Sequence, residues 1–212
     1  MAMLTRLTIV AFASLLALGF KHAPLDPREQ DNARSFVEQS VNEGISILND
    51  ASLTEAERDE KFRSLFLSVT NMQRIALFTL GRHRRGIATR HVDAFVAAFT
   101  DYSVAFYENQ LLKGQGTRIQ ITGAAERSPM EAIVNAVLIN AAAKQPTHIA
   151  FRVVNDGERL HIADMQFEGM WFSLYERDEF GAALQRNGEN LPLLTAYLRN
   201  ETERLQSGGK SP

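Results

Sequence analysis

In the first half of the chain, hydrophobic residues recur at the three- and four-residue spacing that places them on one face of an α-helix. A stripe from Phe36 to Leu48 predicts a first helix, for which Asp26 is the expected N-cap. Thr54 followed by Glu57 is a capping-box pattern and predicts the start of a second helix. Each of these helices should bury one face.

Two more helices are predicted before the pattern changes. Asn71 precedes a short helix that Gly81 is placed to end, and Thr89 opens the longest helix, which Gly114 and Gly116 should stop. One face of the longest helix carries an apolar and aromatic stripe that consists of Val92, Phe95, Val96, Phe99, Tyr102, Ser103 and Phe106. This face is expected to be buried.

From residue 117 the hydrophobic positions alternate, which indicates β-strands. We expect strands at 118–121, at 132–140, around 149–153 and at 160–167. Asn155, Asp156 and Gly157 predict a hairpin turn between the last two strands, because glycine tolerates the positive φ angle that such turns require. Two helices should close the chain, one at about 179–185 and one opened by Asn190.

Helices followed by consecutive strands and tight turns favour an α+β fold, in which helices are segregated from an antiparallel sheet. We expect one domain over residues 20–206, with a helical lobe at about 26–113, a sheet of four or five strands at about 117–168 and closing helices at about 169–206. Residues 207–212 should form a disordered tail. The 212 residues, 45% of them hydrophobic, can bury a core of that size.

The N-terminal segment has the character of a secretory signal peptide. Arg6 precedes an apolar run of roughly 12 residues, which fits a signal-peptide core and is shorter than the about 20 residues that cross a membrane. Ala17 and Gly19 are small residues at the minus-three and minus-one positions of a cleavage site. We therefore expect residues 1–19 to be removed and the protein to be exported; an uncleaved membrane anchor is the alternative.

Composition excludes several classes of function. The formal net charge of −2 does not favour binding to nucleic acid, and the absence of cysteine excludes disulfides, thiol nucleophiles and cysteine-ligated metal sites. The five histidines are not spaced as a metal-binding pair on one helical turn, so no metal site is expected.

Asp164 and Glu168 are the one carboxylate pair with potential for acid–base catalysis. Such chemistry requires a desolvated carboxyl group in a pocket with a raised pKa. An NTF2-like sheet can hold such a site, so an NTF2-like enzyme that uses Asp164 or Glu168 is one hypothesis. The structural alternative is that Asp164 accepts hydrogen bonds from the backbone or from Arg177, while Glu168 and Gly169 shape a turn.

The block from His161 to Phe180 resembles the D-x-x-x-E-G and R-x-x-F signature of the MlaC-like periplasmic phospholipid-binding proteins, also called the toluene-tolerance family. The matching positions are Asp164, Glu168, Gly169, Arg177 and Phe180, whereas Trp171 replaces the usual serine. A second, shorter match comprises Leu80, Gly81 and Arg82, with His83 and Arg84 where aromatic residues are usual.

The resemblance implies a helical lobe on a strongly curved NTF2-like antiparallel sheet, with no catalytic residues and no cofactor. It implies a soluble periplasmic shuttle that carries phospholipid between the inner and outer membranes and supports outer-membrane lipid asymmetry. The implied partners are an inner-membrane ABC transporter with an MCE-domain ring, an outer-membrane lipoprotein complex and, transiently, the membrane itself. A carrier for another lipid, such as a hopanoid, is an alternative.

The chain contains 13 phenylalanines, and an aromatic stripe at helical spacing is more often core than ligand site. The resemblance implies that the acyl chains lie in an apolar pocket between helices and sheet. The predicted lining residues are Phe66, Ile75, Phe78, Phe95, Phe99, Tyr102, Phe106, Phe151, Val153, Ile162, Met165 and Phe167. Arg82, Arg84 and Arg85 are candidates for contact with a phosphate, although a basic cluster there also suits a solvated helix end.

Overall fold

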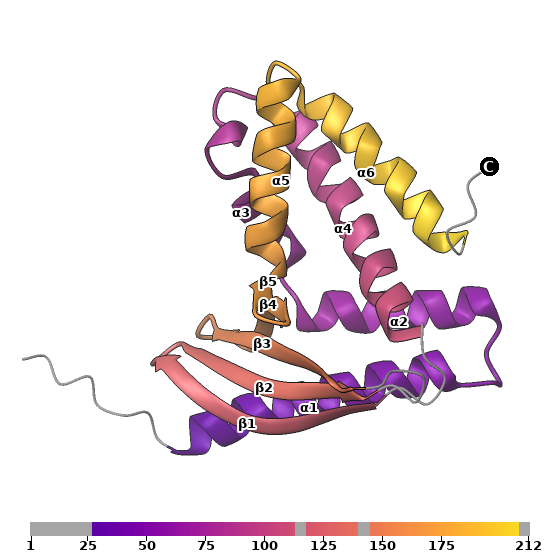
Figure 1. Cartoon of the computed structure of the whole chain (residues 1–212), viewed down its shortest axis with the longest axis vertical. Helices are drawn as coiled ribbons and strands as arrows, with labels where there is room; N and C mark the ends of the chain where they lie inside the picture. Colours follow the sequence, from indigo (N-terminus) through magenta and orange to yellow (C-terminus); the bar gives the residue numbers. More distant parts are fainter. Residues whose placement is uncertain (1–26, 113–117, 140–144, 208–212) are drawn as a thin grey trace, which may run out of the picture.

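A computed structural model describes residues 27–112, 118–139 and 145–207 (Figure 1). Four α-helices come first: α1 (Pro27–Asn49), α2 (Glu55–Val69), α3 (Met72–Leu80) and α4 (Thr89–Leu112), with a short 3₁₀ helix η1 (Gly81–Arg84) after α3. The strands are β1 (Arg118–Ser128), β2 (Glu131–Ile139), β3 (Thr147–Asn155), β4 (Leu160–Phe167) and β5 (Met170–Trp171). Helices α5 (Phe172–Arg186) and α6 (Leu191–Gln206) follow. This order confirms the predicted α+β class.

The five strands form one antiparallel sheet in sequence order, each strand paired with the next. Figure 1 shows that the sheet curves, that α1 runs along it, and that α3, α4, α5 and α6 stand together to one side. Alternate residues of the strands, including Val134, Phe151 and Val153, are buried against Ala33 and Val37 of α1. Such alternation is the expected pattern for a sheet with one covered face.

Side-chain caps confirm three of the predicted helix starts. The Thr54 hydroxyl accepts from the Glu57 amide at 3.3 Å, and the Glu57 carboxylate accepts from the Thr54 amide at 2.9 Å. Asn71 and Asn190 each accept a backbone hydrogen bond from the residue three positions later, at 3.1 Å. These side chains satisfy amides that have no partner within the helix. The predicted cap Asp26, Gly114 and Gly116, the signal segment 1–19 and residues 208–212 of the tail lie outside the described residues.

Two element boundaries differ from the prediction. Helix α5 begins at Phe172 rather than near residue 179, because its first turn is stabilised by contacts from outside the helix and not by a local cap. Strand β1 continues past residue 121 to Ser128, where small and charged residues pair with β2 after a register shift between Ile121 and Gly123. The pairing with β2 extends β1 beyond the part with clear alternation.

The interior is divided into two hydrophobic cores. The first lies among the helices and contains Phe95, Phe99, Leu184 and Leu198, and the second lies between α1 and the sheet. Met165 and Phe167, at the end of β4, pack against both cores. In the part of the chain that the structure describes, no helix has the length and hydropathy needed to cross a membrane.

Candidate functional site

A cavity with an almost entirely apolar wall lies between helices α1 and α2 and the covered face of the sheet. Its volume is about 100 Å³, several times the ~10–15 Å³ that one water requires. The helices contribute Val41, Gly44, Phe62, Leu65, Phe66, Val69, Met72, Ile75, Tyr107, Leu111 and Phe172. The sheet contributes Ile119, Leu138, Ile149, Phe151, Ile162, Met165 and Phe167.

Two hydroxyl groups in this wall, those of Ser40 and Thr70, donate to backbone carbonyls four residues earlier in the chain. The hydroxyl of Ser40 donates to the carbonyl of Phe36, and the hydroxyl of Thr70 donates to the carbonyl of Phe66, each at 2.7 Å. Burial raises the pKa of the Tyr107 hydroxyl well above its ordinary value, and the nearby carboxylates of Asp164 and Glu176 raise it further. Tyr107 therefore stays uncharged. Its hydroxyl, the Gln110 amide and the Asp164 carboxylate are the other polar groups of the lining side chains.

Asp164 has its hydrogen-bonding capacity taken up by the protein. The carboxylate accepts from the backbone amide of Ser173 at 3.0 Å, from the Ser173 hydroxyl and from the amide of Met165 at 2.9 Å. Because the Ser173 amide belongs to the first turn of α5, Asp164 acts as a cap supplied by the sheet. The predicted alternative contact with Arg177 is absent among the contacts of the described residues.

Glu168 is likewise engaged in the turn after β4. Its carboxylate accepts from the amide of His148 at 2.7 Å, and its own amide donates to the His148 carbonyl at 2.9 Å. Glu168 and Gly169 have φ angles of 44° and 86°, which a reversal of the chain requires here. This geometry supports the structural reading of Asp164 and Glu168 over an acid–base pair.

The structure brings together half of the residues predicted to line the pocket: Phe66, Ile75, Phe151, Ile162, Met165 and Phe167 all face the cavity. Phe95 and Phe99 instead lie in the helical core, where both rings meet Phe180 edge-on at 5.8 and 6.0 Å between centroids. Tyr102 and Phe106 form an aromatic layer on α4, and the Phe106 ring stacks on Phe172, whose side chain does line the cavity. Val153 lies in the core beneath α1.

The remaining predicted residues lie away from the cavity. Phe78 is 37% exposed, and the guanidinium of Arg177 lies over its ring at 4.9 Å from the centroid. Arg82, Arg84 and Arg85 follow the end of α3 that is opposite to its cavity-lining residues Met72 and Ile75, and none of them is part of the cavity wall.

The sequence did not predict that residues of α1 and of the strand ends line the cavity. Val41 and Leu65 were recognisable as members of helical stripes, and Ile119 and Ile149 as alternating strand positions. These signals mark burial in general and do not distinguish a core position from a cavity wall. In the described segments, no group of three or more histidine, aspartate or glutamate residues is arranged to hold a metal ion.

Comparison with protein families gives a match between residues 38–200 and the family described as MlaC protein. The match covers well over half of the chain. The chain belongs to the MlaC family. No curated protein matches it. A solved structure of a phospholipid-binding protein from Ralstonia solanacearum, in complex with a phospholipid, has a TM-score of 0.71 and 15% sequence identity over 82% of this chain and 98% of that chain. This likeness shows that the two proteins share a fold.

Two residues of the MlaC-type signature of this chain, Arg177 and Phe180, connect α5 to α3 and α4 through side-chain contacts. The Arg177 guanidinium fills the space above Gly81, where an added Cβ would lie 3.3 Å from it, and also covers Phe78. Phe180, three residues later, packs between Phe95 and Phe99. Together with the Asp164 cap, these contacts fix α5 on both the sheet and the helical layer.

Proposed function

We propose that this MlaC-family protein binds a phospholipid in the periplasm, with the acyl chains in the cavity between α1, α2 and the sheet, and carries it between the inner and outer membranes. The observation that carries the proposal is the apolar cavity itself. Membership of the MlaC family and the phospholipid held by the structurally similar protein from Ralstonia solanacearum support it.

The chemistry of the wall suits hydrocarbon chains of variable length. Aromatic residues such as Phe62 and Phe66 supply large apolar areas, and the flexible thioethers of Met72 and Met165 adapt to a changing guest. A phospholipid needs more room than the cavity offers in this state. The cavity lies where the two hydrophobic cores meet, so we expect it to widen by a small separation of α1 and α2 from the sheet.

The energetics favour a carrier over a protein that releases lipid into water. Two acyl chains with on the order of 30 methylenes would correspond to roughly 24 kcal/mol of transfer from water, at about 0.8 kcal/mol each. That exceeds the practical limit of about 18 to 21 kcal/mol for non-covalent binding. Lipid taken from a membrane exchanges one apolar medium for another at small net cost, so exchange takes place at a membrane or a partner.

Direction must then come from the docking partners. In this proposal they are an inner-membrane ABC transporter with an MCE-domain ring and an outer-membrane lipoprotein complex, as for the family in general. The predicted signal segment 1–19 would deliver the protein to that compartment. N-terminal sequencing of the exported protein should begin at residue 20.

Native mass spectrometry of the purified protein tests lipid binding directly. We expect a bound species whose mass identifies a phospholipid after extraction, and Leu65→Trp should lower its fraction because the larger ring fills the cavity. The control is Leu67→Trp, at a 36% exposed position on the same helix that does not line the cavity. It should keep the lipid.

A wild-type protein that is always free of lipid would contradict the proposal. So would equal lipid content in the two tryptophan variants, provided that both have wild-type circular dichroism. If the extracted lipid is a hopanoid or another lipid and not a phospholipid, the cavity remains the proposed binding site and the identity of its ligand changes.

A further inference from the structure

A second hollow lies outside the cavity, in the groove between α5 and α6 with α4 as its floor. Its volume is about 590 Å³, within the roughly 300–1,000 Å³ typical of small-molecule sites. Tyr175, Leu193 and Tyr197 line it and are 46%, 49% and 55% exposed. Large apolar side chains that remain this exposed along a groove indicate a surface that is covered in some other state.

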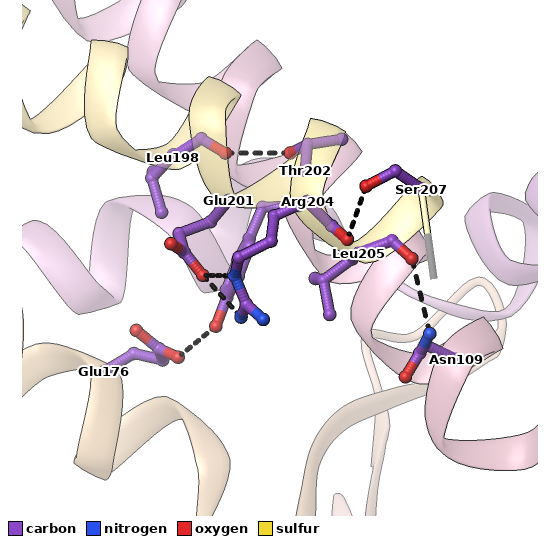
Figure 2. Close-up of polar contacts among 9 residues, drawn as sticks. Asn109, Glu176, Leu198, Glu201, Thr202, Arg204, Leu205 and Ser207 are labelled. Carbon is purple, nitrogen blue, oxygen red and sulfur yellow. Dashed lines mark hydrogen bonds and ion pairs between the residues drawn. The ribbon is translucent and has the colours of Figure 1, made fainter. Parts of the chain in front are cut away.

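A buried carboxyl group lies in this groove. Glu176 of α5 is only 4% exposed and accepts one hydrogen bond, at 3.2 Å, from the hydroxyl of Tyr102 on the floor. No ion pair within the described residues joins Glu176 to a cation, although a buried carboxylate normally has one. Arg204 of α6 is held by Glu201 at 2.7 and 2.9 Å (Figure 2).

The surroundings favour a positively charged guest. The side chains of Glu176, Tyr102 and Tyr197 line the same groove. Tyrosine rings and a carboxylate around one space are the recurring way in which proteins hold substituted ammonium groups. A neutral guest would leave the buried carboxylate without compensation.

We propose that the groove between α5 and α6 is a binding site for an organic ammonium group, which pairs with Glu176 and lies against the rings of Tyr175 and Tyr197. The same chemistry is offered by a free amine and by the amine headgroup of a lipid. The site is separate from the apolar cavity, since the two have no lining residue in common. It would give a lipid carrier a second, polar recognition point.

The acidity of Glu176 adds a dependence on pH. Burial raises its pKa to about 7, and Glu179 contributes in the same direction, while the hydrogen bond from Tyr102 opposes the shift. The other charged or titratable groups around Glu176 are Tyr175 and Arg186 from α5, Tyr107 from α4, and Tyr197, Glu201 and Arg204 from α6. Because the ammonium ion pairs with the ionised carboxylate, its affinity should rise as the pH increases through about 7.

The test measures the binding of choline to the full protein by NMR titration or calorimetry, with 3,3-dimethylbutan-1-ol as its neutral isostere. We expect choline to bind and the alcohol not to bind. Glu176→Gln should weaken choline binding by about tenfold or more, since a hydrogen bond or contact to a charged group is lost. Tyr197→Ala should weaken it severalfold, and Tyr197→Phe should retain it because the ring face remains.

Glu203→Gln is the matched control, since it removes one carboxylate from an exposed position on α6 outside the groove. It should leave choline binding unchanged. A vesicle flotation assay distinguishes a free amine from a lipid headgroup as the ligand. It compares binding to vesicles of phosphatidylethanolamine and phosphatidylglycerol with binding to vesicles of phosphatidylglycerol alone. Binding to the amine-containing vesicles that Glu176→Gln abolishes identifies a lipid headgroup, and choline binding without vesicle binding identifies a free amine.

The proposal is overturned if the wild-type protein binds neither choline nor the amine-containing vesicles. It is also overturned if a folded Glu176→Gln variant binds them as the wild type does. Glu176→Gln should retain the phospholipid seen by native mass spectrometry, so failure of this site is distinguishable from failure of the cavity.

Discussion

The two most buried acidic side chains of the described residues occupy opposite situations. Asp164 is 6% exposed and accepts three hydrogen bonds from Met165 and Ser173, whereas Glu176 is 4% exposed and accepts one, from Tyr102. Asp164 therefore stabilises the fold, whereas the carboxylate of Glu176 remains available to bind a ligand. Sequence alone does not make this distinction, since the partners that decide it, Ser173 for Asp164 and Tyr102 for Glu176, are distant in the chain.

Asp164 should be a stabilising residue without a part in lipid binding. Asp164→Asn weakens the cap of α5 and leaves an amide donor facing the Ser173 donors, so we expect the free energy of unfolding to fall by about 1–3 kcal/mol. Ser173→Ala removes the hydroxyl bond alone and should cost about 1 kcal/mol. Urea denaturation measures both; an unchanged midpoint for Asp164→Asn would show that the cap is not needed.

Glu176 should make the stability of the protein depend on pH. Its ordinary pKa is 4.5 and its pKa in the folded protein is about 7, so the unfolded chain releases the proton first as the pH rises. The free energy of unfolding should therefore fall between about pH 4.5 and pH 7, by up to about 3 kcal/mol, and this contribution should then level off.

Comparison with Glu176→Gln isolates this contribution from those of other groups. The variant cannot ionise at this position, so its stability relative to the wild type should increase from pH 5 to pH 8. Glu203→Gln, at an exposed position, serves as the control. A stability difference between Glu176→Gln and wild type that stays constant over this range would mean that Glu176 has an ordinary pKa.

At the scale of elements, helices α1 and α3 each depend on a glycine in a different way. A Cβ at Gly44 would lie 3.6 Å from Leu65 and 3.7 Å from Phe62, which is ordinary contact, whereas Gly81 has a φ angle of 51° and touches Arg177. Gly44→Ala should therefore stabilise the protein by about 0.5–1 kcal/mol, because alanine is the better helix residue.

Gly81→Ala should have the opposite effect on stability. The substitution places a Cβ in a left-handed conformation and against the guanidinium of Arg177, so it should destabilise the protein by about 1–3 kcal/mol. Thermal denaturation of both variants measures the difference. If both shifted the melting temperature in the same direction, the roles assigned to these two glycines would be wrong.

Elements with local signals were predicted well, and elements that rely on partners were not. Thr54, Asn71 and Asn190 mark helix starts through bonds within a single turn, and β4 has the predicted bounds, Leu160–Phe167. The start of α5 was misplaced because its cap, Asp164, comes from β4, eight residues before Phe172, and no local pattern records it.

At the scale of the whole molecule, the cavity exists because the helices and the sheet each have a core of their own. Met165 and Phe167 are the described residues that pack against both cores, and the cavity lies between members of the two cores. Such a boundary can open without unfolding either core. This arrangement is what the proposed lipid carriage requires.

Removal of lipid should therefore lower thermal stability without loss of the fold. A ligand that binds the folded state stabilises it by mass action, so the delipidated protein should melt at a lower temperature than the lipid-bound protein and retain its far-ultraviolet circular dichroism. In Leu65→Trp, whose side chain fills the cavity, the difference between the two preparations should be much smaller. Equal melting temperatures for lipid-bound and delipidated wild type would contradict binding in the cavity.

The sequence by itself determined the helices, the strands, their order and the α+β class, because spacing, caps and turns act over a few residues. It also marked which positions are buried. Only the tertiary structure decided that Phe95 and Phe99 meet Phe180 in a closed core while Phe66 and Phe151 face a cavity. A hydrophobic stripe shows that a face is covered, but whether space remains beside it depends on how closely elements distant in sequence approach each other.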